Sequence, residues 1–256
     1  MTSAVSNGKI VSTVTHLSIC VVLLSLLSAC ATTSNNTATQ PEKPIPEQQD
    51  RSTINQLGKG DFDRMADVEI RENTESLRSL MLKLYKRNPH ELQKSTPDVA
   101  EKMTNWVFDG EAQHHNRFEA INNLQGTEAI FLAFKPEYTG DRVLPFIVGL
   151  QTMLLKAHGG KTDFYLRDNI DPQHIYNIAR NIEIAAWKLS NARDELGALY
   201  LLTNEMNDKD KNLSFEREFG KMIGRTDLYA IALAEKSQRM ISRIMQNLAT
   251  AIFLPF

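Results

Sequence analysis

Apolar side chains recur at spacings of three and four residues over long stretches of this chain, and this periodicity limits the fold more than any other feature. An α-helix turns once in about 3.6 residues, so side chains at these spacings share one helix face and can pack against a core. No series of alternating strands and no strand-helix repetition is visible. We therefore predict a mostly α fold with a single helical domain. The two clearest runs are Leu77, Leu80, Met81, Leu84 and Tyr85, and then Ile175, Ile178, Ala179, Ile182, Ala185, Ala186 and Leu189.

Prolines and short polar residues mark where helices begin and end. Proline disfavours helical geometry in the residue before it, so one helix is predicted to end at residues 88–89, an Asn-Pro pair. A capping residue followed by proline is typical of a helix start. Such starts occur at residues 96–98, which would open a helix to about Val107, and at residues 171–172.

The C-terminal part of the chain also has helical periodicity. Ser214 is expected to begin one helix, and a last helix is expected from about Asp227. The apolar tail that follows, residues 248–256, either packs on the domain core or offers an apolar plug to a partner. The expected apolar positions of the last helix are Leu228, Ile231, Met240, Ile241, Ile244, Met245, Leu248 and Ile252.

The middle of the chain is less regular. Residues 128–134 are an apolar run short enough to be either a buried helix or a strand. Residues 143–155 predict a core helix that begins near Arg142, although they include a proline and a glycine. Residues 162–167 are the best strand candidate.

Gly159-Gly160-Lys161-Thr162 resembles the end of a phosphate-binding P-loop. That motif requires a glycine where this chain has Leu155, and no strand precedes it. The better interpretation is a helix end at which Gly159 or Gly160 adopts a left-handed conformation. His158 would then lie in the last helical turn.

A polar segment separates the N-terminus from the periodic region. Residues 31–52 contain almost no large apolar side chains and include three prolines. Such a segment buries too little surface to offset its ordering entropy, so we interpret it as a flexible tether. The expected organisation is a signal peptide over 1–29, a lipid anchor and linker over 30–59, and a helical periplasmic domain over 60–256. The formal charge of −2 and the lack of a basic stretch give no reason to expect a nucleic-acid partner.

The N-terminus has the layout of a secretion signal. Residues 17–27 form an uncharged apolar run, which is shorter than the roughly 20 residues that a membrane-spanning helix needs. The run ends in Leu27-Ser28-Ala29-Cys30, which resembles the lipobox of bacterial lipoproteins. The resemblance implies cleavage before Cys30, diacylglycerol on its thiol and a further acyl chain such as palmitate on the new amine. The alternatives are an ordinary signal peptide or an N-terminal membrane helix.

The residues next to the predicted anchor indicate the membrane to which the protein is sorted and the cysteines that the mature chain keeps. Ala31 follows the cysteine where an aspartate would imply retention at the inner membrane, so the same resemblance suggests the outer membrane, facing the periplasm. Cys20 lies inside the apolar run and would be removed with it. The mature chain would keep one acylated cysteine, which excludes an intramolecular disulfide.

Few residues are candidates for metal binding or catalysis. Residues 111–115 contain a Glu-x-x-His pair, which di-iron helix bundles use twice, but this chain has no second copy. Glu119 lies four residues after His115 and would share a helix face with it. His114, His115 and Glu119 are therefore metal-site candidates, against the simpler interpretation of a polar, solvent-exposed helix start. No nucleophile motif or paired acids are visible, so no catalytic residue and no cofactor is predicted.

These patterns together suggest a function in the cell envelope. We expect an outer-membrane-anchored periplasmic lipoprotein that acts as a binding or scaffolding component. Its expected partners are the membrane, through lipid on Cys30, and another envelope protein or a cell-wall component. The alternatives are an envelope hydrolase with carboxylate or histidine chemistry, or a protein that binds a metal or a small molecule.

Overall fold

The computed structural model describes residues 59–165, 169–203, 214–242 and 252–256, and the statements below concern these residues. They belong to one structural unit, residues 52–256. Helices dominate it, no strand is formed within the described ranges, and one antiparallel bridge joins Arg193 to Leu199. The prediction of a mostly α fold is confirmed. None of the described helices is long and apolar enough to cross a membrane. The predicted signal peptide and lipobox lie outside the described residues.

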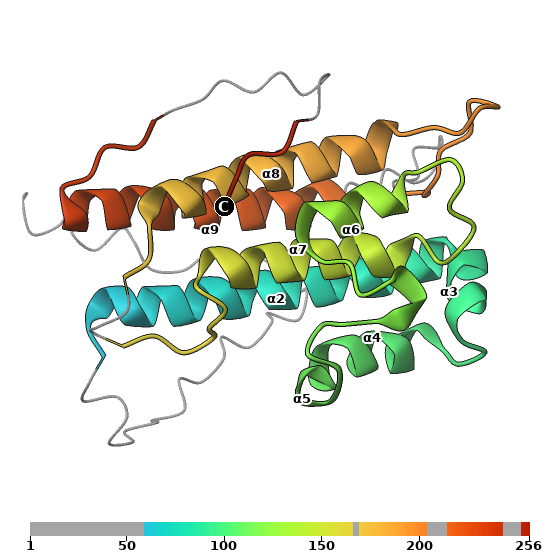
Figure 1. Ribbon diagram of the computed structural model, residues 1–256, viewed down its shortest axis with the longest axis horizontal. Helices are drawn as coiled ribbons and strands as arrows, with labels where there is room; N and C mark the ends of the chain where they lie inside the picture. Colours follow the sequence, from blue (N-terminus) through green and yellow to red (C-terminus); the bar gives the residue numbers. More distant parts are fainter. Residues whose placement is uncertain (1–58, 166–168, 204–213, 243–251) are drawn as a thin grey trace, which may run out of the picture. The chain divides into compact units, whose positions relative to one another are not determined.

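Four long helices run beside one another and shorter helices cover one side and one end of them (Figure 1). Helices α2, α7, α8 and α9 form the long layer, α6 packs on α7, and α3 and α4 pack on α2. In chain order the elements are α2 (Asp61–Arg87), α3 (Pro89–Ser95), α4 (Ala100–Asp109), α5 (Glu111–His114), the 3-10 helix η2 (Glu119–Ile121), α6 (Gly126–Ala133), α7 (Val143–Ala157), α8 (Pro172–Asn191) and α9 (Ser214–Ser237).

Helix α7 is the centre of the core, and of its residues only Lys156 is exposed. Gly149 allows α6 to approach α7 closely. A Cβ atom at Gly149 would lie 2.6 Å from the carbonyl oxygen of Gly126 and 2.6 Å from Cγ1 of Ile130. The core helix expected over residues 143–155 is confirmed, and the ambiguous run at 128–134 proves to be helical as far as Ala133.

The two predicted helical faces are confirmed as core. Leu77, Leu80, Met81, Leu84 and Tyr85 are all buried, and on α8 every residue of the predicted stripe is buried except Ala186, which is partly buried.

Two proline-marked boundaries are confirmed and one is wrong. Helix α2 ends at Arg87, before the Asn-Pro pair. Helix α8 begins at Pro172, and its first turn is capped by Asp171, whose carboxylate accepts the Gln173 N–H at 2.9 Å. Residues 96–98 do not start α4, which begins at Ala100. The Thr96 hydroxyl instead accepts the N–H of Asp98 at 3.1 Å, so the local hydrogen bond forms a turn rather than a cap.

The expected last helix from Asp227 is also wrong. Helix α9 is continuous from Ser214 to Ser237, so Asp227 lies near its middle. Leu228 and Ile231 are 64% and 46% exposed, because α9 turns a different face, including Phe219, to the core. Met240 lies beyond the helix and is exposed, while Ile244, Met245 and Leu248 lie outside the described residues. Within the strand candidate, residues 162–165 form no strand and 166–167 are not described.

A polar pair is buried where α2, α7 and α9 meet. Nε2 of His158 lies 2.9 Å from Oε2 of Glu69, and their side chains are 0% and 4% exposed. The contact has the distance of an ion pair without the alignment of a hydrogen bond. Oε1 of Glu69 accepts hydrogen bonds from Asn73 at 2.6 Å and from Thr226 at 2.7 Å. Three helices are thus joined through one carboxylate.

The end of α7 has the predicted geometry. Gly159 and Gly160 both have positive φ angles, 72° and 73°, and the Gly160 N–H donates to the Leu155 carbonyl at 2.7 Å. The helix-end interpretation of the Gly-Gly-Lys-Thr segment is confirmed.

Candidate functional site

A cavity of about 950 Å³ opens between α3, α4, η2 and the loop that precedes α7. Its wall carries an exposed tryptophan, its floor a buried carboxylate, and its rim side chains of both charges. A cavity of this size with a few polar groups is the usual form of a small-ligand site. The lining residues with chemical functions include Lys94, Ser95, Trp106, Arg117, Tyr138 and Asp141.

The floor is built around Asp141, which is buried just before α7. Its Oδ1 atom accepts the N–H groups of Val143 at 2.8 Å and Leu144 at 3.3 Å, so it caps the first turn of α7. Its Oδ2 atom accepts the hydroxyls of Tyr85 at 2.6 Å and Ser95 at 2.8 Å. A carboxylate offers about four lone-pair positions, and four donors occupy them here.

These contacts act on the ionisation of Asp141 in opposite directions. Burial raises the pKa of Asp141, while the hydroxyls of Tyr85 and Ser95 and the backbone donors of α7 hold the rise back. The same low-dielectric setting raises the pKa of the Tyr85 phenol well above its ordinary value, first by burial and then by the nearby Asp141 charge. The phenol therefore stays protonated and serves as a permanent donor.

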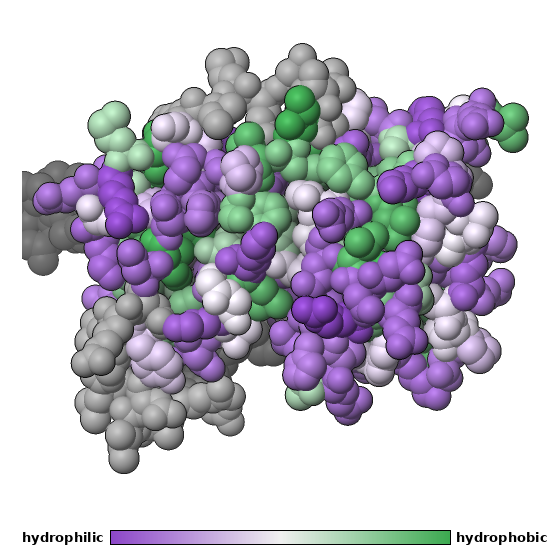
Figure 2. Space-filling view, in the orientation of Figure 1, coloured by the Kyte–Doolittle hydropathy of each residue, from purple (hydrophilic) through white to green (hydrophobic). Residues whose placement is uncertain are grey.

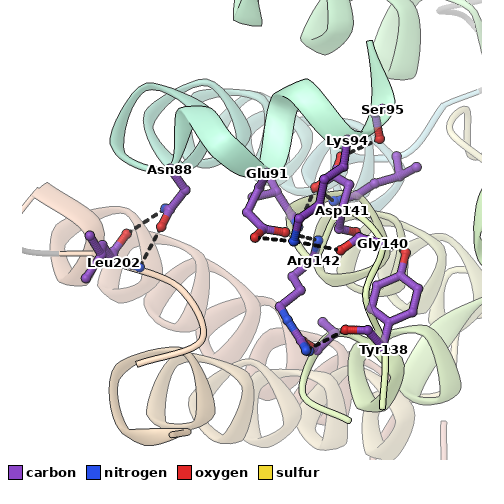
Figure 3. Close-up of polar contacts among 12 residues, drawn as sticks. Asn88, Glu91, Lys94, Ser95, Tyr138, Gly140, Asp141, Arg142 and Leu202 are labelled. Atoms are coloured by element: carbon purple, nitrogen blue, oxygen red, sulfur yellow. Dashed lines mark hydrogen bonds and ion pairs between the residues drawn. The ribbon is translucent and has the colours of Figure 1, made fainter. Parts of the chain in front are cut away.

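The loop before α7 is held by hydrogen bonds from α3 and by its own Arg142 side chain (Figure 3). The backbone N–H of Arg142 donates to Oε2 of Glu91 at 2.7 Å, and the ammonium of Lys94 donates to Oε1 of the same carboxylate at 2.6 Å. Lys94 also reaches the Gly140 carbonyl at 3.3 Å, and the Arg142 guanidinium donates to the Tyr138 carbonyl at 2.5 Å. The cavity floor is accordingly fixed by α3 rather than left as a free loop.

Tyr138 is half-buried at the edge of the cavity. Its hydroxyl donates to the backbone carbonyl of Asp141 at 3.1 Å. Burial, followed by the charge of Asp141, raises the pKa of Tyr138 to about 12. This phenol is therefore a hydrogen-bonding group at neutral pH rather than a base.

The wall is an aromatic cluster from α4, α5 and the segment before η2. The ring of Trp106 lies 5.2 Å from that of His114 and 5.1 Å from that of Phe118, and the His114 and Phe118 rings are 4.4 Å apart. Phe118 is buried, whereas Trp106 is 46% exposed. The cluster thus positions the partly exposed Trp106 side chain in the wall of the cavity.

His114 is used structurally through both ring nitrogens. Its Nδ1 accepts the N–H of Asn116 at 3.0 Å, and its Nε2 lies 3.1 Å from the Trp106 carbonyl. Because a carbonyl only accepts, the second contact requires the proton on Nε2. A metal could bind His114 only after one of these bonds breaks.

The other two metal candidates do not share a helix face with each other. Helix α5 ends at His114, and His115 and Asn116 have positive φ angles of 51° and 55°. Glu119 opens the separate helix η2. The expectation that His115 and Glu119 lie one turn apart on one helix is wrong, because the chain leaves the helix between them. Within the described ranges no three His, Cys, Asp or Glu side chains are grouped as metal ligands.

The rim of the cavity has mixed charge. Lys102 pairs with Asp98 at 3.0 Å across one turn of chain, an exposed pair worth about 0.3–0.5 kcal/mol. Lys94 is paired with Glu91. Arg117 and Glu119 both line the cavity, and neither forms an ion pair with another described residue. A charged ligand group can therefore pair with Arg117 without displacing an existing partner.

Trp106, Asp141 and Arg117 were not among the sequence-predicted candidates. Of the predicted residues, Glu119 lines this cavity, His114 supports its aromatic wall, and His115 lines a different cavity. Cys30 lies outside the described residues. A signal for Asp141 was present, since an aspartate directly before the helix start expected near Arg142 is a common capping position. Comparison with protein-family models, curated proteins and solved structures found no match to this chain.

Proposed function

We propose that this chain is a lipid-anchored binding component of the bacterial cell envelope. The lipobox-like Leu27-Ser28-Ala29-Cys30 and the polar segment 31–52 support a tether at the outer membrane with the helical domain in the periplasm. In this proposal the domain takes a cell-wall ligand into the cavity beside Trp106.

The observation that carries binding rather than catalysis is the saturation of Asp141. It is the buried carboxylate on the cavity floor, and four donors occupy its acceptor positions. A general base must have a free lone pair within hydrogen-bond reach of the proton it removes. Asp141 instead fixes the start of α7 and the positions of Tyr85 and Ser95. The cavity has a firm floor that keeps its shape for a ligand.

The lining indicates the kind of ligand. The partly exposed Trp106 side chain suits a flat or ring-shaped group, and the Arg117 guanidinium suits a carboxylate or phosphate, to which it can donate two parallel hydrogen bonds. A cell-wall glycopeptide combines sugar rings with free carboxylates. We therefore propose carboxylate-bearing cell-wall fragments as the ligand class.

The test uses the fluorescence of Trp106. The chain has two tryptophans, so Trp187→Phe leaves Trp106 as the only indole. Soluble muropeptides should change its emission saturably, and the same fragments with amidated carboxyls should bind more weakly. Arg117→Ala should weaken binding about tenfold or more, because a hydrogen bond to a charged group contributes about 1.5–3 kcal/mol.

The matched control is Arg71→Ala, since Arg71 is an exposed arginine of α2 that does not line the cavity. Its effect should be within a factor of two of no change. If muropeptides cause no saturable change, or if both arginine variants behave alike, the proposed ligand site is wrong.

A further inference from the structure

A short C-terminal segment, Ile252–Phe256, crosses the face formed by α6 and α8 without helical or strand structure (Figure 1). Ile252 and Pro255 are exposed, and the other three residues are partly buried. Figure 2 shows apolar side chains gathered in the middle of this face, over α6 and α8, with hydrophilic side chains around them. The segment packs on this face between Phe131 of α6 and Asn181 of α8, and we call the surface that it covers the groove.

Three amide side chains line one face of α8. Gln173, Asn177 and Asn181 are spaced by four residues, so they lie one above another along the helix. The amide of Gln173 donates to Oδ1 of Asn177 at 2.8 Å, which joins two of them directly. We call these three residues the amide ladder.

The amide ladder binds main chain rather than side chains. Asn181 accepts the N–H of Leu254 at 2.6 Å and donates to the carbonyl of the same residue at 2.9 Å. Asn177 donates to the Pro255 carbonyl at 2.7 Å. Gln173 accepts the N–H of Ser242 at 2.8 Å and reaches its carbonyl at 3.3 Å. An amide can pair in this way with the backbone of any residue that has an N–H group, whatever its side chain.

Two members of the ladder are buried, and burial makes their pairing energetically important. Asn181 is 0% exposed and Asn177 is 5% exposed. A buried amide without partners loses the hydrogen bonds it would make with water. Within the described residues, the Asn181 side chain bonds to Leu254 and to no other residue. This position is therefore built to receive a peptide backbone.

Two aromatic rings of the segment occupy places beside the ladder. The Phe253 ring packs edge-on against Phe131 of α6, with centroids 5.1 Å apart. The Phe256 ring lies on Gly126, where an added Cβ would come within 3.4 Å of it, and Nζ of Lys156 lies 5.1 Å from its centroid. These contacts give the groove a preference for aromatic side chains three positions apart.

The groove also has space beyond the segment. A cavity of about 950 Å³ is bordered by Phe256 and extends along the start of α6 and the end of α7 to Gly160. Its lining is mostly polar and includes Glu128 and Lys156. A peptide that carries polar residues after the second aromatic ring would fit there.

We infer that the groove between α6 and α8 is a peptide-binding site that the chain's own residues 252–256 occupy, and that its partner is a protein segment with two aromatic residues three positions apart. The partner segment displaces the chain's own segment and pairs its backbone with Asn177 and Asn181 of the amide ladder. This site is separate from the cavity beside Trp106 and does not depend on the function proposed for that cavity.

The test measures binding of a labelled peptide to the full chain. The probe is a fluorescein-labelled peptide with the sequence of residues 248–256, and binding is followed by fluorescence anisotropy. Phe253→Ser/Phe256→Ser weakens the chain's own segment, so this variant should bind the probe at least tenfold more tightly than the unaltered chain. The unaltered chain binds weakly, because a tethered competitor acts at an effective concentration on the order of millimolar.

A second probe distinguishes recognition of the peptide backbone from nonspecific hydrophobic binding. N-methylation at Leu254 of the peptide removes the N–H that Asn181 accepts, without any change to the protein, and should weaken binding about tenfold or more. Replacing the same leucine by valine in the peptide should change binding less than threefold. On the protein, Asn181→Leu should abolish binding, whereas Asn191→Leu, at an exposed position of the same helix, should have no effect.

The outcomes decide the inference independently of folding defects. Circular dichroism melting of each protein variant identifies any that has lost its structure, and the N-methylated probe needs no protein variant. No binding to the Phe253→Ser/Phe256→Ser chain, or equal binding of the methylated and unmethylated probes, would overturn the inference. Light scattering that shows dimers formed by exchange of the segment would also overturn it, in favour of a second copy as the occupant.

Discussion

The hydrogen bonds to Asp141 lead to a quantitative prediction about two hydroxyls on one oxygen. Tyr85 and Ser95 both donate to Oδ2, at 2.6 and 2.8 Å, but Tyr85 is buried and Ser95 is exposed. Tyr85→Phe removes a donor that water cannot replace, so it should lower the free energy of unfolding by about 1.5–3 kcal/mol. Ser95→Ala opens a place that water can fill, and it should cost less than about 1 kcal/mol.

The assay is urea unfolding followed by circular dichroism, with the midpoint and slope fitted for each variant. For a domain of about 200 residues, the Tyr85→Phe loss corresponds to a fall in melting temperature of about 3–12 °C. The double variant Tyr85→Phe/Asp141→Asn should lose less than the sum of the single variants, because both act on one contact. Equal losses for Tyr85→Phe and Ser95→Ala would refute the reasoning that burial decides the value of these bonds.

Four further outcomes follow from other parts of the chain. Cys30→Ser should abolish lipidation, and mass spectrometry of the mature N-terminus checks this; an unmodified chain that begins elsewhere contradicts the anchor. Ile182→Ala should cost about 2–5 kcal/mol in urea unfolding, because the side chain is fully buried. His158→Leu should cost about 3–5 kcal/mol, since it leaves Glu69 buried with one partner fewer, and the Glu69→Leu/His158→Leu chain should be less impaired than the two losses summed. Burial raises the pKa of Asp141, so between 3.8 and the raised value the folded chain keeps a proton that the unfolded chain has released. The free energy of unfolding should therefore fall as the pH rises through this range. Asp141→Asn should remove this part of the pH dependence.

Helix faces were predictable because their information is local. Leu84 and Ile182 repeat with neighbours three and four positions away, and both are fully buried. Local periodicity does not say which of two apolar stripes faces the core. On α9 the stripe with Leu228 and Ile231 is partly solvent-exposed, because α2 and α8 pack on the face that carries Phe219 and Tyr229.

The candidate site was much less predictable, because it combines distant parts of the chain. Trp106 comes from α4, Arg117 from the segment before η2 and Asp141 from the loop before α7. His114 attracted attention as a metal ligand, yet backbone groups of Trp106 and Asn116 hold both of its ring nitrogens. Contacts with backbone atoms leave no pattern in the spacing of side chains. The four-residue spacing of the amide ladder on α8 can be read from the sequence, but its backbone partners near the end of the chain cannot.

The buried contact between Glu69 and His158 sets the register of the helices that carry it. If α7 slid along α2 by one turn, about 5.4 Å, the imidazole would leave the buried carboxylate, which would keep only its bonds to Asn73 and Thr226. A cost of about 3–5 kcal/mol would hold the slipped arrangement below about 1% of molecules. The slipped arrangement is therefore too rare to couple ligand binding in the cavity at one end of the domain to binding in the groove on α8. Any coupling between the two must pass through the elements packed outside this frame, chiefly α6, which borders the groove and leads into the loop that carries Asp141.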